Sequence, residues 1–174
     1  MMRAEPRAVH EEFMALALAE ARQALDRNEF PVGCVIVYAG EVVATGARQH
    51  SSGRVNELDH AELVALRTLF DTAPELDLTA VTVYSTMEPC LMCYATLVVN
   101  NVGTVVYGYE DVMGGGTGLA LPSLAPLYAE RRIAVVPRVL RPQCLELFQR
   151  FFRSGANGYL HDSLLARYTL DQQT

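Results

Sequence analysis

The sequence predicts an α/β fold in three layers, with a β-sheet between helices. Short apolar segments that suit strands alternate with amphipathic segments that suit helices, and a helix between two strands favours their parallel pairing. The chain of 174 residues suits one hydrophobic core, and 51% of its residues are hydrophobic, which can offset the entropy lost on ordering. We therefore expect one compact domain at residues 1–153, followed by a C-terminal tail at residues 154–174.

The expected elements follow from hydrophobic periodicity and from turn residues. In chain order they are a helix at 9–27, strands at 32–38 and 41–46, a polar loop at 48–59, a helix at 60–70, a strand at 81–85, a helix at 90–100, strands at 102–109 and 133–136, and a helix at 143–152.

Each element has a local reason. The first helix carries Phe13 and Leu18 on adjacent apolar stripes. Ala39-Gly40 supplies a tight reversal, so the first two strands form a hairpin. Four glycines between positions 114 and 118 indicate a flexible loop before the last strand. The tail places leucines at helical spacing, so it is either a short helix packed on this domain or on a dimer partner, or a frayed end.

Composition limits the function. The formal net charge of −6 gives no support to binding a phosphate backbone. No apolar stretch reaches the roughly 18 residues of a membrane span, and the N-terminus lacks the apolar core of a signal peptide, so we expect a cytoplasmic protein with no membrane partner. Four cysteines are too few for a disulfide scaffold of this size, which favours thiols or metal ligands.

Two short motifs carry the chemistry, each at a predicted helix start. One is His60-Ala61-Glu62 and the other is Pro89-Cys90-Leu91-Met92-Cys93. One histidine and two cysteines supply the three nitrogen and sulfur ligands of a catalytic zinc site, whose fourth position stays open for water. Cys90 and Cys93 share one face of the first helical turn, where the helix dipole favours thiolates. We therefore predict one Zn²⁺ per chain, held by His60, Cys90 and Cys93.

Glu62 is the candidate proton carrier. It lies two residues beyond a zinc ligand, so it can take a proton from the activated water and deliver it to a ring nitrogen and then to departing ammonia. The same pair of motifs is known from the zinc nucleobase deaminases. The competing interpretation is a structural zinc or nucleic-acid-binding module, in which Cys34, Cys144 or His50 completes a closed four-ligand site.

These motifs resemble the cytidine deaminase-like superfamily, in particular the branch of bacterial tRNA adenosine deaminases and guanine deaminases. Phe30-Pro31-Val32-Gly33, His60-Ala61-Glu62-Leu63, Glu88 to Cys93 and Tyr107-Gly108 carry the resemblance, which covers most of the chain. It implies a three-layer α-β-α sandwich with a five-stranded mixed sheet, one zinc per subunit, and a homodimer with active sites near the interface.

The resemblance also predicts the residues around the substrate. The family asparagine that holds the base or sugar is absent, because the matching region reads Ala47-Arg48-Gln49-His50. Arg48 either pairs with an anionic substrate group or is a solvated loop residue, and we favour the second because exposed arginines are common. Asp59 either caps the following helix, which we favour, or brings a carboxylate close to the site. The candidate substrate contacts are Arg48, His50, Asn56, Ala61, Glu88 and Pro89, although His50 also suits the surface.

The expected function is hydrolytic conversion of an amino-bearing nucleobase or nucleoside to its oxo form, with release of ammonia. The substrate is open: it is an adenine-like or other amino-bearing base, either in tRNA or as a free nucleoside or base, or it is a small free base such as guanine, cytosine or a triazine-like ring. The missing asparagine and the acidic charge weigh against tRNA and leave deamination intact.

Overall fold

The computed structural model describes residues 5–173 of the chain, so residues 1–4 and Thr174, the outer ends of the predicted domain and tail, lie outside it. The elements are α1 (Arg7–Asp26), β1 (Gly33–Tyr38), β2 (Glu41–Ala47), α2 (Ala61–Thr72), a 3-10 turn η1 (Leu78–Ala80), β3 (Val81–Met87), α3 (Leu91–Val99), β4 (Thr104–Tyr109), a 3-10 turn η2 (Leu121–Ser123), α4 (Pro126–Ala129), β5 (Ala134–Val136), α5 (Arg141–Ser154) and α6 (Leu164–Asp171).

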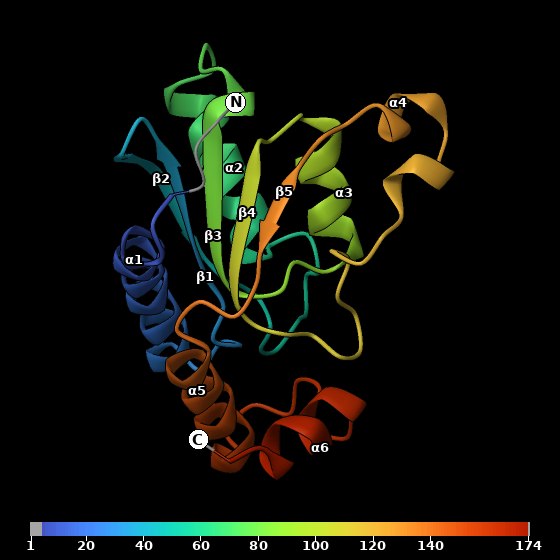
Figure 1. Cartoon of the computed structure of the whole chain (residues 1–174). Coiled ribbons are helices and arrows are strands. Elements are labelled where there is room, and N and C mark those ends of the chain that lie inside the picture. The colour runs from blue at the N-terminus through green and yellow to red at the C-terminus, as the bar shows by residue number, and fades with distance from the viewer. Residues whose placement is uncertain (1–4, 174) are drawn as a thin grey trace.

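The five strands form one mixed sheet in the order β2-β1-β3-β4-β5. β1 pairs antiparallel with β2 and with β3, whereas β3, β4 and β5 are parallel to one another. Helices α1 and α5 lie on one side of the sheet, and α2 and α3 lie on the other (Figure 1). The predicted three-layer sandwich with a five-stranded mixed sheet is confirmed.

The hairpin between β1 and β2 has the predicted turn. Ala39 and Gly40 both adopt positive φ, at 51° and 81°. Positive φ at both central residues is the requirement of a type I′ turn, whose twist matches that of the strands it joins. Tyr38 and Glu41 consequently face each other at the end of the ladder.

Two glycines bring helices close to the sheet. A Cβ atom on Gly33 of β1 would overlap the backbone of α1 at Ala17 and Ala21. A Cβ atom on Gly46 of β2 would likewise overlap the backbone of α2 at Ala61. Because this contact is close, the first turn of α2, with Glu62, is fixed against the end of β2.

The segment between β4 and β5 contains more structure than a glycine loop. Short helical turns η2 and α4 begin at or next to Pro122 and Pro126, where proline suits the first helical turn. They are too short to leave a periodic pattern in the sequence. The glycine loop itself packs against the second motif, because the Gly116 amide donates to the Pro89 carbonyl at 2.8 Å.

The C-terminal tail folds onto its own chain. The Ser163 side chain caps α6 by accepting the Ala166 amide at 3.1 Å. The Tyr109 hydroxyl of β4 lies 3.1 Å from the Thr169 hydroxyl, and the Gln149 amide of α5 donates to the Thr169 carbonyl. Among the alternatives for the tail, the described residues therefore form a helix packed on this domain.

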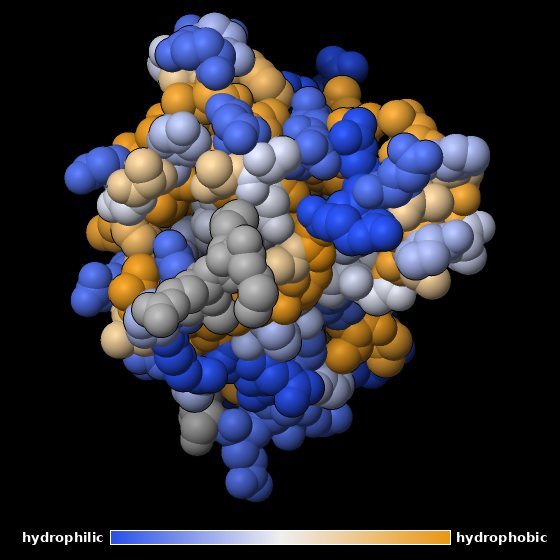
Figure 2. All heavy atoms as spheres, turned by 45° about the horizontal axis from the view of Figure 1, so that its top comes forward, coloured by the Kyte–Doolittle hydropathy of each residue, from blue (hydrophilic) through white to orange (hydrophobic). Residues whose placement is uncertain are grey.

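Hydrophobic side chains also reach the surface, and Figure 2 shows them in several patches between hydrophilic ones. Leu91 and Val99 of α3 and Leu127 of α4 are 57%, 42% and 53% exposed. Within residues 5–173, no helix is both long and apolar enough to span a membrane.

Candidate metal centre and active site

The three predicted zinc ligands come together at the starts of α2 and α3. His60 and Cys90 are the N-cap residues of these helices, with extended backbone conformations, and neither side chain caps its helix. His60 Nδ1 lies 3.6 Å from Cys90 Sγ and 3.5 Å from Cys93 Sγ. The ligand atoms of all three residues lie within 4.8 Å of one another.

This geometry fits a zinc ion. In a tetrahedral site with Zn–S near 2.3 Å and Zn–N near 2.1 Å, a sulfur and a nitrogen ligand lie about 3.6 Å apart. Both observed separations from His60 Nδ1 match that value. The separations between the histidine nitrogen and each sulfur therefore suit a bound zinc ion.

The electrostatics of the pair of cysteines favour a thiolate. A hydrogen bond with the Cys93 thiol lowers the pKa of Cys90 to about 4 against the cost of burial, and a hydrogen bond with His60 adds to this. The same hydrogen bond to Cys90, together with burial, raises the pKa of Cys93. A thiolate is the form of cysteine that binds metal.

Glu62 lies beside the cluster in the first turn of α2 and is 3% exposed. Its carboxylate accepts the Ser85 hydroxyl of β3 at 3.0 Å, and its other oxygen is 3.6 Å from Cys93 Sγ. Burial raises the pKa of Glu62, although the nearby His60 opposes this. A buried carboxyl group with a raised pKa is suited to accept a proton and to give it back near neutral pH.

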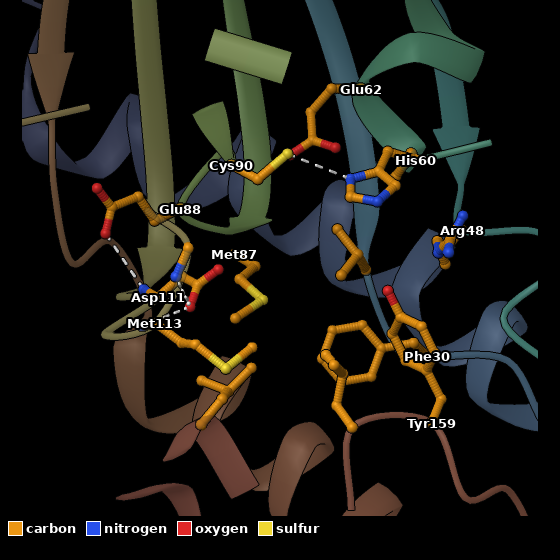
Figure 3. A pocket seen from close by; sticks show the side chains of 15 residues that line it. Phe30, Arg48, His60, Glu62, Met87, Glu88, Cys90, Asp111, Met113 and Tyr159 are labelled. Atoms are coloured by element: carbon orange, nitrogen blue, oxygen red, sulfur yellow. Dashed lines mark hydrogen bonds between the residues drawn. The ribbon is translucent and has the colours of Figure 1, made fainter. Parts of the chain in front are cut away.

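A pocket of about 190 Å³ opens beside this cluster. His60, Cys90 and Glu62 lie together at one end, as Figure 3 shows. The other labelled side chains form the two sides: Arg48, Phe30 and Tyr159 on one, and Met87, Glu88, Asp111 and Met113 on the other. The glycine loop therefore contributes one wall, at Asp111, Met113 and Gly114.

The predicted substrate contacts divide into two groups. Ala61, Glu88 and Arg48 line the pocket. Glu88 is held in place, because one oxygen accepts the Thr117 hydroxyl and the other accepts the Asp111 amide at 3.2 Å.

His50, Asn56 and Pro89 are not among the lining residues. His50 lies at the surface, where its ring contacts Asp59 at 2.7 Å, and the Asn56 side-chain amide donates to the same carboxylate at 2.6 Å. Asn56 instead contributes its backbone carbonyl, which accepts from Arg48. The structure brings neither side chain into the pocket, and Pro89 acts through its carbonyl, which binds the glycine loop.

The favoured interpretation of Arg48 as a solvated loop residue is wrong. Arg48 is 2% exposed, although it lies at the start of a polar loop. Its guanidinium donates to the Asn56 carbonyl and to Glu57 Oε2, each at 2.8 Å, and its Cζ lies 5.4 Å from the centre of the Tyr159 ring. The ion pair and the aromatic face together compensate the burial of its charge.

The expected cap at Asp59 is wrong as well. His60 is the N-cap of α2 and no side chain caps this helix. The Asp59 carboxylate instead binds His50, Asn56 and Arg67. These hydrogen bonds, that with His50 foremost, lower the pKa of Asp59. Its role is to fasten the loop before the motif.

The contributions to the site that were not predicted include those of Glu57 and of the C-terminal tail. Glu57 accepts hydrogen bonds from Arg48, from His60 Nε2 and from Tyr159. Tyr159, Leu160 and Leu165 of the tail line the pocket. No local pattern marks Glu57, and the tail residues show only helical spacing, so the sequence offers no signal for either contact.

The closed four-ligand alternative finds no support among the described residues. The metal-ligand group contains His60, Cys90 and Cys93 and neither Cys34, Cys144 nor His50. Cys34 and Cys144 are fully buried in the hydrophobic core, where burial raises the pKa of each thiol.

Residues 7–109 match the model of a family described as the cytidine and deoxycytidylate deaminase zinc-binding region, which is more than half of the chain and includes His60, Cys90 and Cys93. The chain belongs to this family. The predicted resemblance is thereby confirmed, and with it a zinc-binding deaminase domain.

Curated relatives of the deaminase point to one branch. The chain is 32% identical to a tRNA-specific adenosine deaminase of Streptococcus pyogenes over 145 residues, which are 82% of this chain and 89% of the relative. A tRNA-specific adenosine deaminase of Bacillus subtilis is also 32% identical, over 81% of this chain and 87% of its own. A solved structure from a study of tRNA:A34 deaminases in A-to-I editing is 28% identical, with a TM-score of 0.68, and covers 78% of this chain and 98% of its own.

Proposed function

We propose that this deaminase is a zinc-dependent hydrolase that converts an amino-bearing nucleobase to its oxo form and releases ammonia, as in the tRNA adenosine deaminases. The observation that carries the proposal is the approach of three ligand atoms, from His60, Cys90 and Cys93, within 4.8 Å at the end of a pocket that also contains the buried carboxyl group of Glu62. Three ligands rather than four are typical of catalytic zinc.

His60 Nδ1 and the two cysteine sulfurs would hold the ion. Bound zinc supplies Lewis-acid activation of a water molecule near neutral pH. The Glu62 carboxylate would take a first proton from this water and give it to a ring nitrogen as the water oxygen bonds to the amino-bearing carbon. It would then carry the second proton of that oxygen to the amino group, which leaves as ammonia when its C–N bond breaks. The Ser85 hydroxyl, 3.0 Å from Glu62 Oε1, keeps the carboxyl group of Glu62 oriented. The other carboxyl oxygen, Glu62 Oε2, faces the cluster.

The walls of the pocket suit a flat heterocycle. Phe30 and Tyr159 present aromatic surfaces on one side, and Met87 and Met113 present flexible apolar ones. These side chains exclude bulk water from the reacting carbon, while Glu88 and Arg48 are the polar groups that can orient the ring. Identity to tRNA-specific adenosine deaminases favours an adenine base in tRNA as the first substrate to test.

A small free base is the second candidate, and one observation favours it. The tail residues Tyr159, Leu160 and Leu165 close one wall of a cavity of about 190 Å³, which is below the roughly 300–1,000 Å³ of pockets for drug-sized ligands. A single base matches this space better than a nucleotide within a folded RNA, and the net charge of −6 does not attract a phosphate backbone.

We further propose that the domain spans residues 1–153 with residues 154–174 as its tail, that it works in the cytoplasm, and that it forms a homodimer. The dimer proposal is supported by the groove between α3 and the η2–α4 segment. Its lining is almost wholly apolar, with Leu91, Val99, Leu121 and Tyr128 among its members.

The test uses purified protein with a panel of free bases, nucleosides and tRNA, and measures ammonia release and bound zinc. The wild type should release ammonia from one class of substrate, which identifies it. Glu62→Gln should keep one zinc per chain while its rate falls by about 100-fold or more, because the proton carrier is lost. Unchanged ammonia release by Glu62→Gln would refute the role of this residue, and a wild type without zinc would refute the proposed function.

A further inference from the structure

Glu57 connects three side chains around the metal cluster. Its Oε2 atom accepts a hydrogen bond from Arg48 at 2.8 Å, lies 3.1 Å from His60 Nε2, and accepts the Tyr159 hydroxyl at 2.9 Å. Arg48 and Tyr159 are donors, and His60 Nε2 is a donor in the tautomer that carries its proton there, so the Glu57 carboxylate can serve all three as acceptor. Glu57 lies in the loop before α2, three residues ahead of His60, and is not itself in the metal-ligand group.

The carboxylate beside His60 Nε2 favours the tautomer that carries its proton on that nitrogen. Nδ1 faces the two cysteine sulfurs, and Nε2 faces the Glu57 carboxylate. A histidine that donates Nε2–H to a carboxylate leaves the Nδ1 lone pair free for a metal, and such a partner also fixes the orientation of the ring.

Glu57 is itself held from two directions. Arg48, which is 2% exposed, donates one terminal nitrogen of its guanidinium group to Glu57 and the other to the Asn56 carbonyl. Tyr159 belongs to the C-terminal tail, 102 residues further along the chain, and its ring lies against the Arg48 guanidinium. An ion pair and a hydroxyl group therefore fix the carboxylate of a residue whose side chain is otherwise 56% exposed.

We propose that Glu57 is a positioning residue for the metal ligand His60, and that the C-terminal tail supports the metal site through the Tyr159 hydroxyl. Arg48 then acts by holding Glu57, which gives this buried cation a role besides any contact with substrate. The inference rests on the zinc site of the proposed function and adds to it the loop and tail that orient one ligand.

The experiment measures the zinc dissociation constant of the full-length protein by competition with a chelator, without substrate. Glu57→Ala should weaken zinc binding about 10- to 100-fold, as is usual for loss of such a partner. The zinc dissociation constant of Glu57→Gln should fall between those of Glu57→Ala and the wild type, because the amide keeps one acceptor. Tyr159→Phe should weaken binding in the same direction by a smaller factor. Glu41→Ala, at an exposed position on β2, is the matched control and should bind zinc like the wild type.

Glu57→Ala leaves the buried Arg48 unpaired, so Arg48→Met/Glu57→Ala is included to remove that charge as well. This double variant should still bind zinc about 10- to 100-fold more weakly. A second readout is the exchange of the His60 Nε2 proton with solvent, followed by NMR with ¹⁵N-histidine, which should be slow in the wild type and faster in both Glu57→Ala variants.

Zinc binding at wild-type strength in the double variant would overturn the inference, because the loss in Glu57→Ala would then come from the unpaired arginine alone. So would unchanged exchange of the Nε2 proton. Either result leaves the zinc-dependent function standing, whereas a wild type that binds no zinc removes that function itself.

Discussion

At the scale of single residues, the cysteines allow a matched comparison. Cys93 and Cys34 are both fully buried, but only Cys93 belongs to the metal-ligand group. Cys93→Ala should lose nearly all bound zinc, because two ligands hold the ion poorly, whereas Cys34→Ala should retain one zinc per chain. Metal analysis of the desalted proteins measures this. Loss of zinc from Cys34→Ala would contradict the three-ligand site.

The role of a residue was predictable from the sequence where it depends on that residue and its near neighbours in the chain. The ligand set could be predicted because His60, Cys90 and Cys93 are themselves the chemistry and their spacing places them at helix starts. Arg48 could not be assigned in this way, because its burial depends on Glu57 nine residues away and on Tyr159 in the tail. A general preference of arginine for the surface gives the wrong answer when the compensating partners are distant.

At the scale of elements, the long periodic segments and the short strand β5 were predicted to within a few residues, and the short helical turns were missed. Helix α1 and strands β1 and β2 show enough turns or alternations to be recognised. The η2 and α4 turns have no periodicity to detect, and α6 was only one of several alternatives. Its position is decided by contacts such as that between Thr169 and Tyr109, which no sequence pattern records.

The carboxylate of Glu110 links β4 to α5 and α6, and its ionisation makes the free energy of unfolding depend on pH. Glu110, at the end of β4, accepts bonds from Arg141 of α5 at 2.8 Å and from Tyr168 of α6 at 2.8 Å. Burial alone would raise the pKa of Glu110, but the hydrogen bonds outweigh it, that with Arg141 foremost, and lower the pKa to about 2. Because the pKa is lower in the folded state, the stabilisation is complete above the ordinary value of 4.5 and is lost as pH falls towards 2.

Glu110→Gln should therefore reduce the free energy of unfolding by on the order of 2–3 kcal/mol at pH 7 and by less than about half of that at pH 3. Urea denaturation at the two pH values measures the difference. Glu146→Gln, at an exposed position of α5, should change little at either pH. An equal loss for Glu110→Gln at pH 3 and pH 7 would mean that packing, not the ion pair, accounts for it.

At the scale of the whole molecule, the apolar groove predicts association. If the groove along α3 and the η2–α4 segment meets a second copy, Val99→Asp should convert a dimer to a monomer, because it introduces an unpaired charge into the interface. Light scattering after gel filtration measures the mass. Leu16→Asp, on α1, is the control, since Leu16 is 47% exposed and Val99 is 42% exposed. A wild type that is monomeric at micromolar concentration would contradict the dimer.

The order in which the active site is completed follows from where its parts lie along the chain. The metal-ligand residues are all synthesised by position 93, whereas the wall at Tyr159, Leu160 and Leu165 is synthesised much later. A nascent polypeptide thus has all of its ion-binding side chains before it has those that enclose the chamber for the base.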